Sequence, residues 1–153
     1  RQKDPDIALA LHFRSPGIER HTRYENTLAA IEAALSSGIS PQYLMVPCDL
    51  PLLPAGLLAR LLVGEDDGMA CFETPTEQGP ETRALPCRIG TACLPPVIEM
   101  LDAGDRAVRG LVERLGPMTT KVPLASREVD LLMNVNTPED YERACQLLRS
   151  RAD

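Results

Sequence analysis

The sequence predicts an α/β fold in which helices cover a mostly parallel sheet. Three observations support this prediction. Short apolar runs of strand length alternate with segments whose apolar residues recur at helical spacing. The 153-residue length fits a single domain over residues 1–153. The composition is 44% hydrophobic but only 3% aromatic, which predicts an ordinary globular domain with an aliphatic core.

The first half of the chain contains four predicted elements and one long polar loop. Their order is strand 7–11, loop 12–25, helix 27–36, strand 43–46 and helix 55–63. Asn26 is a candidate N-cap of the first helix, and Gly38 is its candidate stop signal. The loop is locally basic, which is typical of a solvated surface loop and, as the less common alternative, of an anion-contacting one.

The second half of the chain continues the alternation. The expected order is strand 69–72, loop 73–82, strand 84–89, helices 95–103 and 106–115, extended segments 119–124 and 129–135, and helix 138–149. Asp105 is the candidate N-cap of the helix over 106–115. Thr137, Pro138 and Asp140 form a near capping box with the favoured proline at the first helical position.

Composition excludes several classes of protein. A net charge of −6 with few aromatic residues argues against nucleic-acid binding, which requires a basic face and stacking side chains. The five cysteines form an odd set without a C-x-x-C motif, which predicts reduced, mostly buried thiols in a cytoplasmic protein. No apolar run approaches the roughly 18 residues of a membrane span.

Three segments carry residues suited to chemistry, and each has an ordinary structural interpretation as well. Asp49 follows a buried strand, where it can hold Mg²⁺ or simply form a turn. Asn134 and Asn136 fall on the same side of a strand, where their amides can bind a polar ring or a phosphate. In the structural interpretation Asn136 starts the turn and Thr137 caps the last helix. Arg106 and Arg109 lie three residues apart and can bind phosphate or remain solvated.

These segments together resemble the molybdenum cofactor guanylyltransferases. The resemblance rests on VPCDLPLLPAGLLARL, on PCRIGTACLPPVIEMLDAGDRAVRGLVERLG and on LLMNVNTPEDYERA, and it covers roughly residues 24–148. It implies a Rossmann-like, three-layer nucleotidyltransferase domain that transfers GMP from GTP to molybdopterin and releases pyrophosphate, with Mg²⁺ as cofactor. Small-molecule substrates are implied as partners, together with molybdoenzymes or proteins of molybdenum cofactor biosynthesis.

Matching positions carry the family's site residues. Asp49 corresponds to the metal-binding and catalytic aspartate, and Asn134 and Asn136 to asparagines near the pterin. Arg106 and Arg109 correspond to a region on the pterin side. The family's N-terminal Leu-Ala-Gly-Gly run has no counterpart here, and Asn26-Thr27-Leu28-Ala29-Ala30 stands where a Gly-Pro-Leu-Ala-Gly run is usual. A longer natural protein is therefore expected.

Two alternatives to the guanylyltransferase remain open from the sequence. One is a related nucleotidyltransferase that uses CTP or a sugar phosphate. The other is a non-catalytic homologue that binds molybdopterin or a partner protein.

Overall fold

A computed structural model describes residues 7–11, 27–64 and 67–150 of the chain. In chain order the elements are β1 (Ile7–Leu11), α1 (Thr27–Ser36), β2 (Gln42–Val46), α2 (Ala55–Ala59), the 3-10 helix η2 (Arg60–Leu62), β3 (Met69–Thr74), β4 (Glu81–Gly90), η3 (Thr91–Cys93), α3 (Leu94–Asp102), α4 (Val108–Leu115), η4 (Gly116–Met118), β5 (Thr119–Pro123), η5 (Ser126–Leu132) and α5 (Pro138–Arg149).

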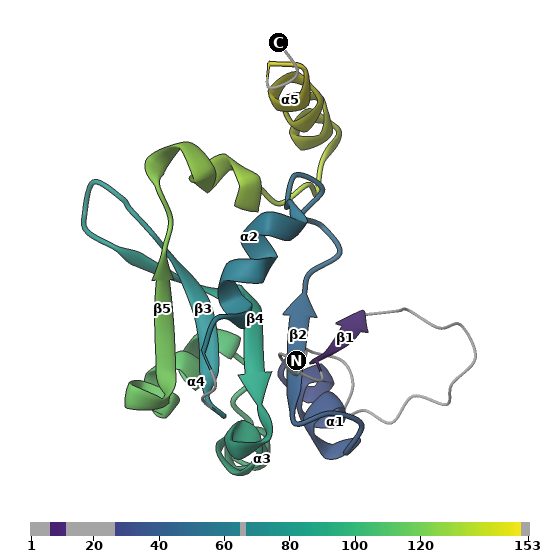
Figure 1. Ribbon diagram of the computed structural model, residues 1–153, viewed down its shortest axis with the longest axis vertical. Coiled ribbons are helices and arrows are strands. Elements are labelled where there is room, and N and C mark those ends of the chain that lie inside the picture. The colour runs from purple at the N-terminus through teal and green to yellow at the C-terminus, as the bar shows by residue number, and fades with distance from the viewer. Residues whose placement is uncertain (1–6, 12–26, 65–66, 151–153) are drawn as a thin grey trace, which may run out of the picture.

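The described strands form one mixed sheet in the order β1-β2-β4-β3-β5 (Figure 1). β1 pairs in parallel with β2, and β3 pairs in parallel with β5. β4 lies between β2 and β3 and runs antiparallel to both. Four of the five described strands therefore point in one direction, and their carboxyl ends meet at the same edge of the sheet.

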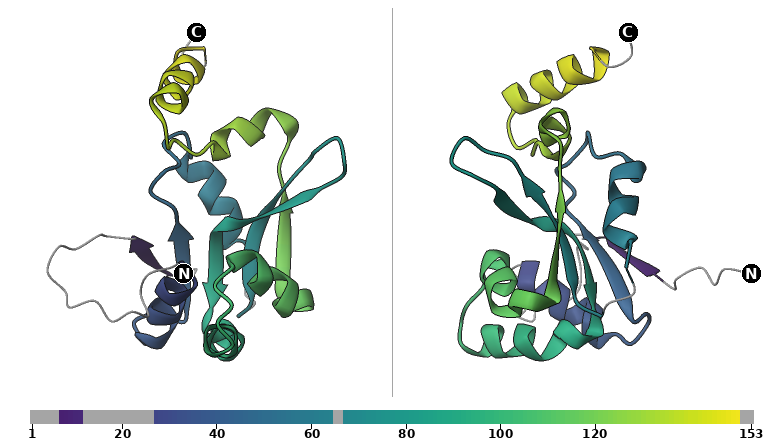
Figure 2. Two further views of the ribbon diagram at one scale, coloured as in Figure 1. Left: turned by 180° about the vertical axis from the view of Figure 1, so that it is seen from behind. Right: turned by 60° about the vertical axis from the view of Figure 1, so that its left-hand side comes forward.

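Helices cover both faces of this sheet, which gives three layers. α1, α3 and α4 lie on one face and α2 lies on the other (Figure 2). Side chains alternate between the two faces along each strand: in β2, Tyr43 and Met45 join the core beneath α1 and α3, whereas Leu44 joins the core beneath α2. The predicted α/β class and layered architecture are confirmed, and β4 is the one described strand that departs from the parallel direction.

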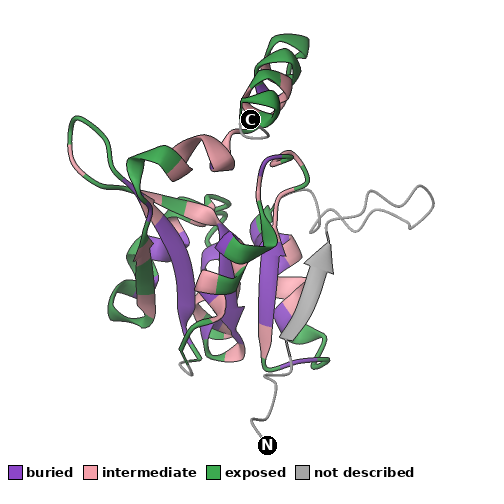
Figure 3. Ribbon diagram, turned by 45° about the horizontal axis from the view of Figure 1, so that its top comes forward, coloured by how far each residue is buried: buried purple, intermediate pink, exposed green. Residues whose placement is uncertain are grey.

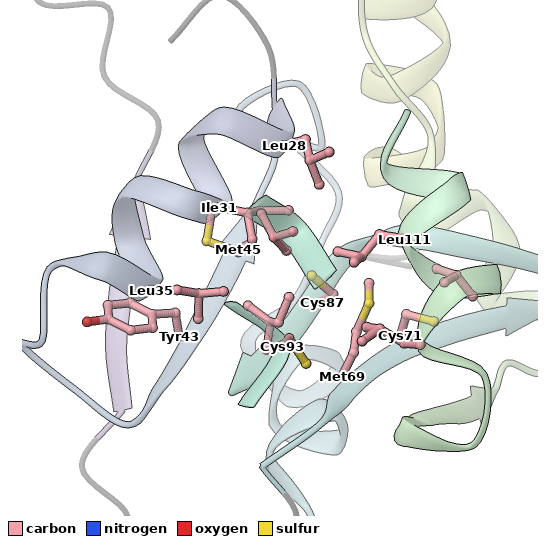
Figure 4. Close-up of a cluster of buried hydrophobic side chains, with 14 of the residues drawn as sticks. Leu28, Ile31, Leu35, Tyr43, Met45, Met69, Cys71, Cys87, Cys93 and Leu111 are labelled. Carbon is pink, nitrogen blue, oxygen red and sulfur yellow. The ribbon is translucent and has the colours of Figure 1, made fainter. Parts of the chain in front are cut away.

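Cysteine and aliphatic side chains fill the core on the α1 face. Cys71 and Cys87 lie opposite each other on β3 and β4, and Cys93 packs beside them (Figure 4). Burial raises the pKa of the Cys71 thiol to about 11 and that of Cys87 further still. All five cysteines are free thiols, and Cys48 is the exposed one.

Sequence patterns located several elements correctly. α1 and α5 have the bounds that were predicted, and β2 begins one residue earlier than predicted. Gly38 has a φ of 67° just beyond α1, as a helix-stopping residue requires. At α5, the Thr137 hydroxyl accepts a hydrogen bond from the Asp140 N–H at 3.1 Å, and the Asp140 carboxylate accepts one from the Thr137 N–H at 3.0 Å. Asn26 and the loop over 12–25 lie outside the described residues.

Three local predictions are wrong. The segment predicted as extended over 129–135 is largely the 3-10 helix η5, so Asn134 and Asn136 do not share one side of a strand. The predicted loop over 73–82 is shorter, because β3 and β4 form a long hairpin. α4 has Ala107 as its N-cap, and Asp105 lies two residues earlier, where its carboxylate accepts the Ala107 N–H at 3.0 Å.

The last helix projects from the rest of the molecule. Figure 3 shows α5 as mostly exposed, and Ala144 is its buried residue. Tyr141 and Leu148 are 63% and 54% exposed. Within the described ranges, no helix is long and apolar enough to cross a membrane.

Candidate functional site

The loop after β2 places Asp49 at the edge of the sheet where the parallel strands end. β2 stops at Val46, and Pro51 and Pro54 restrict the backbone before α2 begins at Ala55. The Asp49 carbonyl accepts a hydrogen bond from the Val135 N–H at 2.9 Å. This hydrogen bond therefore connects the loop after β2 to a segment that lies far away in the sequence.

Asn134 contacts Asp49 through its side chain. The Asn134 amide donates from Nδ2 to Asp49 Oδ2 at 2.5 Å, across 85 residues of sequence. A charge-assisted hydrogen bond of this kind restricts the rotation of the carboxylate. The structure thus brings together two of the residues that the sequence singled out.

The other oxygen of the carboxylate has no hydrogen-bond partner among the residues that the structure describes. Asp49 Oδ1 is buried, and no described residue donates a hydrogen bond to it. A buried carboxylate oxygen without a donor is costly unless a cation or water satisfies it. Mg²⁺ prefers oxygen ligands and commonly takes one or two carboxylates. The Asp49 carboxylate is a ligand of this kind, and the described residues add no cluster of three or more acidic, histidine or cysteine side chains around it.

Asn136 has a different environment from Asn134. Its backbone N–H donates to the Asp140 carboxylate at 3.1 Å, and its side chain is exposed. The hydrogen bonds from the backbone of Asn136 and from Thr137 lower the pKa of Asp140. The turn before α5 is therefore held by backbone N–H groups that donate to the Asp140 carboxylate. The Asn136 side-chain amide is exposed, two residues along the chain from Asn134.

Arg106 and Arg109 lie in a separate part of the structure. They flank the start of α4, on the face of the sheet opposite α2. Arg109 is 81% exposed, lies 3.9 Å from Glu113, and lines an open groove of about 940 Å³ between α4, β5 and the tip of the β3–β4 hairpin. Neither Asp49 nor the two asparagines line this groove. The role of Arg106 and Arg109 on the pterin side stays a prediction.

Sequence reasoning missed one set of contacts close to the site. The Arg60 guanidinium binds the Glu128 carboxylate with N–O distances of 2.9 and 3.1 Å. The two residues lie 68 positions apart, and nothing in the local pattern of either segment indicates the pairing. Only the arrangement of η2 and η5 on the same face of the sheet brings them together.

A family model and individual known proteins indicate the same family. A family model described as a MobA-like NTP transferase domain matches residues 2–119. Two proteins named molybdenum cofactor guanylyltransferase, from Yersinia pestis (strain Pestoides F) and Yersinia pseudotuberculosis serotype O:1b (strain IP 31758), are each 28% identical to this chain over 121 residues. The match covers 79% of this chain, and the chain spans 59% of the length of these relatives.

Solved structures show the same fold. Molybdopterin-guanine dinucleotide biosynthesis protein A from Archaeoglobus fulgidus superposes with a TM-score of 0.64 at 21% identity, covering 82% of this chain and 64% of that one. The 2-C-methyl-D-erythritol 4-phosphate cytidylyltransferase from Thermus thermophilus gives 0.63 at 19% identity, covering 80% and 69%. At these identities the likeness concerns the fold alone.

Proposed function

Because this chain belongs to the MobA-like NTP transferase domain family, we propose that it transfers GMP from GTP to molybdopterin with release of pyrophosphate. The family is one of nucleotidyltransferases, and the transfer activity of this chain, its guanylyl specificity and its acceptor are all part of the proposal. The relatives named molybdenum cofactor guanylyltransferase support this choice of substrates.

One observation carries the proposal, namely the Asp49 carboxylate at the carboxyl edge of the sheet. One of its oxygens is held by Asn134, and the other has no partner among the described residues. In open α/β sheets, ligands bind in the crevice beyond the carboxyl ends of the strands. Asp49 would hold Mg²⁺ there, and the bound ion would neutralise the phosphate charge that builds up as pyrophosphate leaves.

The remaining residues would position the substrates. Phosphoryl transfer depends mainly on orientation and charge neutralisation and makes little covalent demand on the protein. Asn134 would keep the Asp49 carboxylate in one orientation. Asn136 has an exposed amide and would donate or accept hydrogen bonds at the pterin. Arg106 and Arg109 would bind acidic groups of the acceptor, since their guanidinium groups suit phosphate.

The direct test measures pyrophosphate release and guanine dinucleotide formation from GTP and molybdopterin. We expect Asp49→Asn to lower turnover by at least about a hundredfold while the circular dichroism spectrum stays that of the wild type, since the change removes charge and almost no volume. The control is Asp102→Asn, which alters an exposed aspartate at the end of α3. Unchanged turnover in Asp49→Asn would remove this residue from the site.

The same assay distinguishes the alternative functions. Competition between GTP and CTP reports the base preference, and a clear advantage of CTP would contradict guanylyl transfer. Molybdopterin binding without turnover, at saturating GTP and Mg²⁺, would show a binding protein instead of an enzyme. Calorimetric titration of the chain with GTP in the presence of Mg²⁺ gives an independent measure of nucleotide affinity.

A further inference from the structure

Arg60 connects the segment that follows Asp49 to the segment that precedes Asn134. Arg60 is the first residue of η2, which continues directly from α2. Its Nη1 donates to both carboxylate oxygens of Glu128, at 3.1 and 2.9 Å, and its Nη2 donates to the Pro123 carbonyl. A single side chain therefore forms hydrogen bonds to the last residue of β5 and to a residue in the first turn of η5.

Glu128 extends this connection into the backbone of η5. Its Oε2 accepts the Ala125 N–H at 2.9 Å, and its own N–H donates to the Ala125 carbonyl at 2.8 Å. The hydrogen bond from Ala125 and the one from Arg60 hold the pKa of Glu128 below its ordinary value. The carboxylate thus stays charged at neutral pH and binds both partners at once.

Apolar contacts continue along the same interface. Leu57 lies in α2 and Leu61 lies in η2. Both pack in one cluster with Leu124, which precedes η5, and with Leu132, which is the last residue of η5. Beyond Leu132 the chain reaches Asn134 and Val135, which bind the side chain and the carbonyl of Asp49. The interface has a polar contact at each end, with Arg60–Glu128 at one and Asp49–Asn134 at the other.

We propose that Arg60 is a positioning residue, which holds η5 so that the Asn134 amide stays against the Asp49 carboxylate. Arg60 acts on these two residues through Glu128 and the short 3-10 helix. The consequence for turnover rests on the proposed function, whereas the structural coupling between Arg60 and Asp49 does not.

The chemistry of the contact explains why an arginine is required. The guanidinium is a planar fork whose donors reach a carboxylate and a carbonyl at once, whereas a lysine ammonium is a point charge on a flexible chain. The two side chains are 36% and 26% exposed, and a partly solvated pair adds little to global stability. Removing Arg60 should therefore loosen one local interface and leave the main cores intact.

Amide hydrogen exchange tests the coupling without substrate. The variants are Arg60→Met and Arg60→Lys, and the control is Arg114→Met, which removes the exposed Arg114–Glu99 ion pair between α4 and α3 on the other face of the sheet. The reporter is the Val135 N–H, which binds the Asp49 carbonyl, and the reference is the Gly90 N–H, which binds the Gly68 carbonyl within the sheet region. We expect Val135 exchange to be about fivefold faster in Arg60→Met, intermediate in Arg60→Lys and unchanged in Arg114→Met.

Two results would overturn the proposal. One is unchanged Val135 exchange in Arg60→Met. The other is an equal acceleration of Val135 and Gly90, which would mean that the substitution weakens the whole fold. Because Arg60→Lys keeps the charge and the aliphatic chain, it provides the comparison if Arg60→Met does not fold.

A second readout separates this proposal from the proposed function. In the transfer assay we expect Arg60→Met to raise the Mg²⁺ concentration for half-maximal activity about fivefold, with turnover recovering at saturating Mg²⁺ and no such shift in Arg114→Met. Local acceleration at Val135 without any transfer by the wild type would refute the proposed function and support the positioning role. Wild-type transfer with unchanged Val135 exchange in Arg60→Met would support the proposed function and refute the positioning role.

Discussion

The same Gly→Ala substitution should have opposite effects at Gly90 and Gly56. Gly90 ends β4 with φ −96° and ψ 162°, a conformation that alanine adopts readily. A Cβ atom there would lie 2.2 Å from the carbonyl oxygen of Asp67 and 2.6 Å from its carbonyl carbon. Gly56 lies exposed in α2, and a Cβ atom added to it meets nothing within 4 Å.

The magnitudes follow from these distances. Ordinary non-bonded contacts are about 3.5 Å, so the backbone near Asp67 must move by about 1 Å to admit the methyl group. Overpacking of this kind costs about 1–3 kcal/mol. At Gly56, alanine reduces the entropy of the unfolded chain and improves helix propensity, which stabilises by about 0.4–1 kcal/mol.

Urea unfolding followed by circular dichroism measures both free energies, with reductant present to keep the thiols free. A change of about 1 kcal/mol corresponds to about 2–4 °C in Tm for a domain of this size. We therefore expect Gly90→Ala to melt about 2–12 °C below the wild type and Gly56→Ala about 1–4 °C above it. A Gly90→Ala protein as stable as the wild type would refute the reasoning, because the Asp67 backbone would then yield at no cost.

Three further predictions concern a helix in the core, a helix cap and a titrating group. Leu111→Ala should lower the free energy of unfolding by about 2–5 kcal/mol, because Leu111 is fully buried between α4 and the sheet; a loss below about 1 kcal/mol in urea unfolding would contradict the packing. Thr137→Ala should weaken α5 by about 1 kcal/mol. Since α5 is mostly exposed, this loss should appear as faster exchange of the Tyr141 N–H, which binds the Thr137 carbonyl, with little change in Tm. The pKa of Glu128 is depressed in the folded state, so its stabilising contribution should be present above the ordinary glutamate pKa of about 4.3 and disappear as pH falls through the depressed value. In a carboxylate NMR titration, Arg60→Met should raise the pKa of Glu128. An unchanged pKa would show that Arg60 does not stabilise the charged form of this carboxylate.

The candidate site was predictable in part. The position of Asp49 after a buried strand and before two prolines predicts a site residue, and the structure places it at the carboxyl edge of the sheet. The environment of its two oxygens was not predictable, since the amide that binds Oδ2 comes from Asn134, 85 residues further along the chain. The spacing of Asn134 and Asn136 suggested a strand, whereas η5 and the turn before α5 give the two residues different roles.

Elements whose stabilisation is local can be predicted from the sequence alone. Leu28, Ile31 and Leu35 at helical spacing define α1, and Thr137 with Asp140 defines the start of α5, because periodicity and capping act within a few residues. The direction of β4 and the contact of Asn134 with Asp49 follow from the tertiary arrangement of the chain. Those features depend on where the backbone brings distant segments together, and no pattern within a single segment encodes that path.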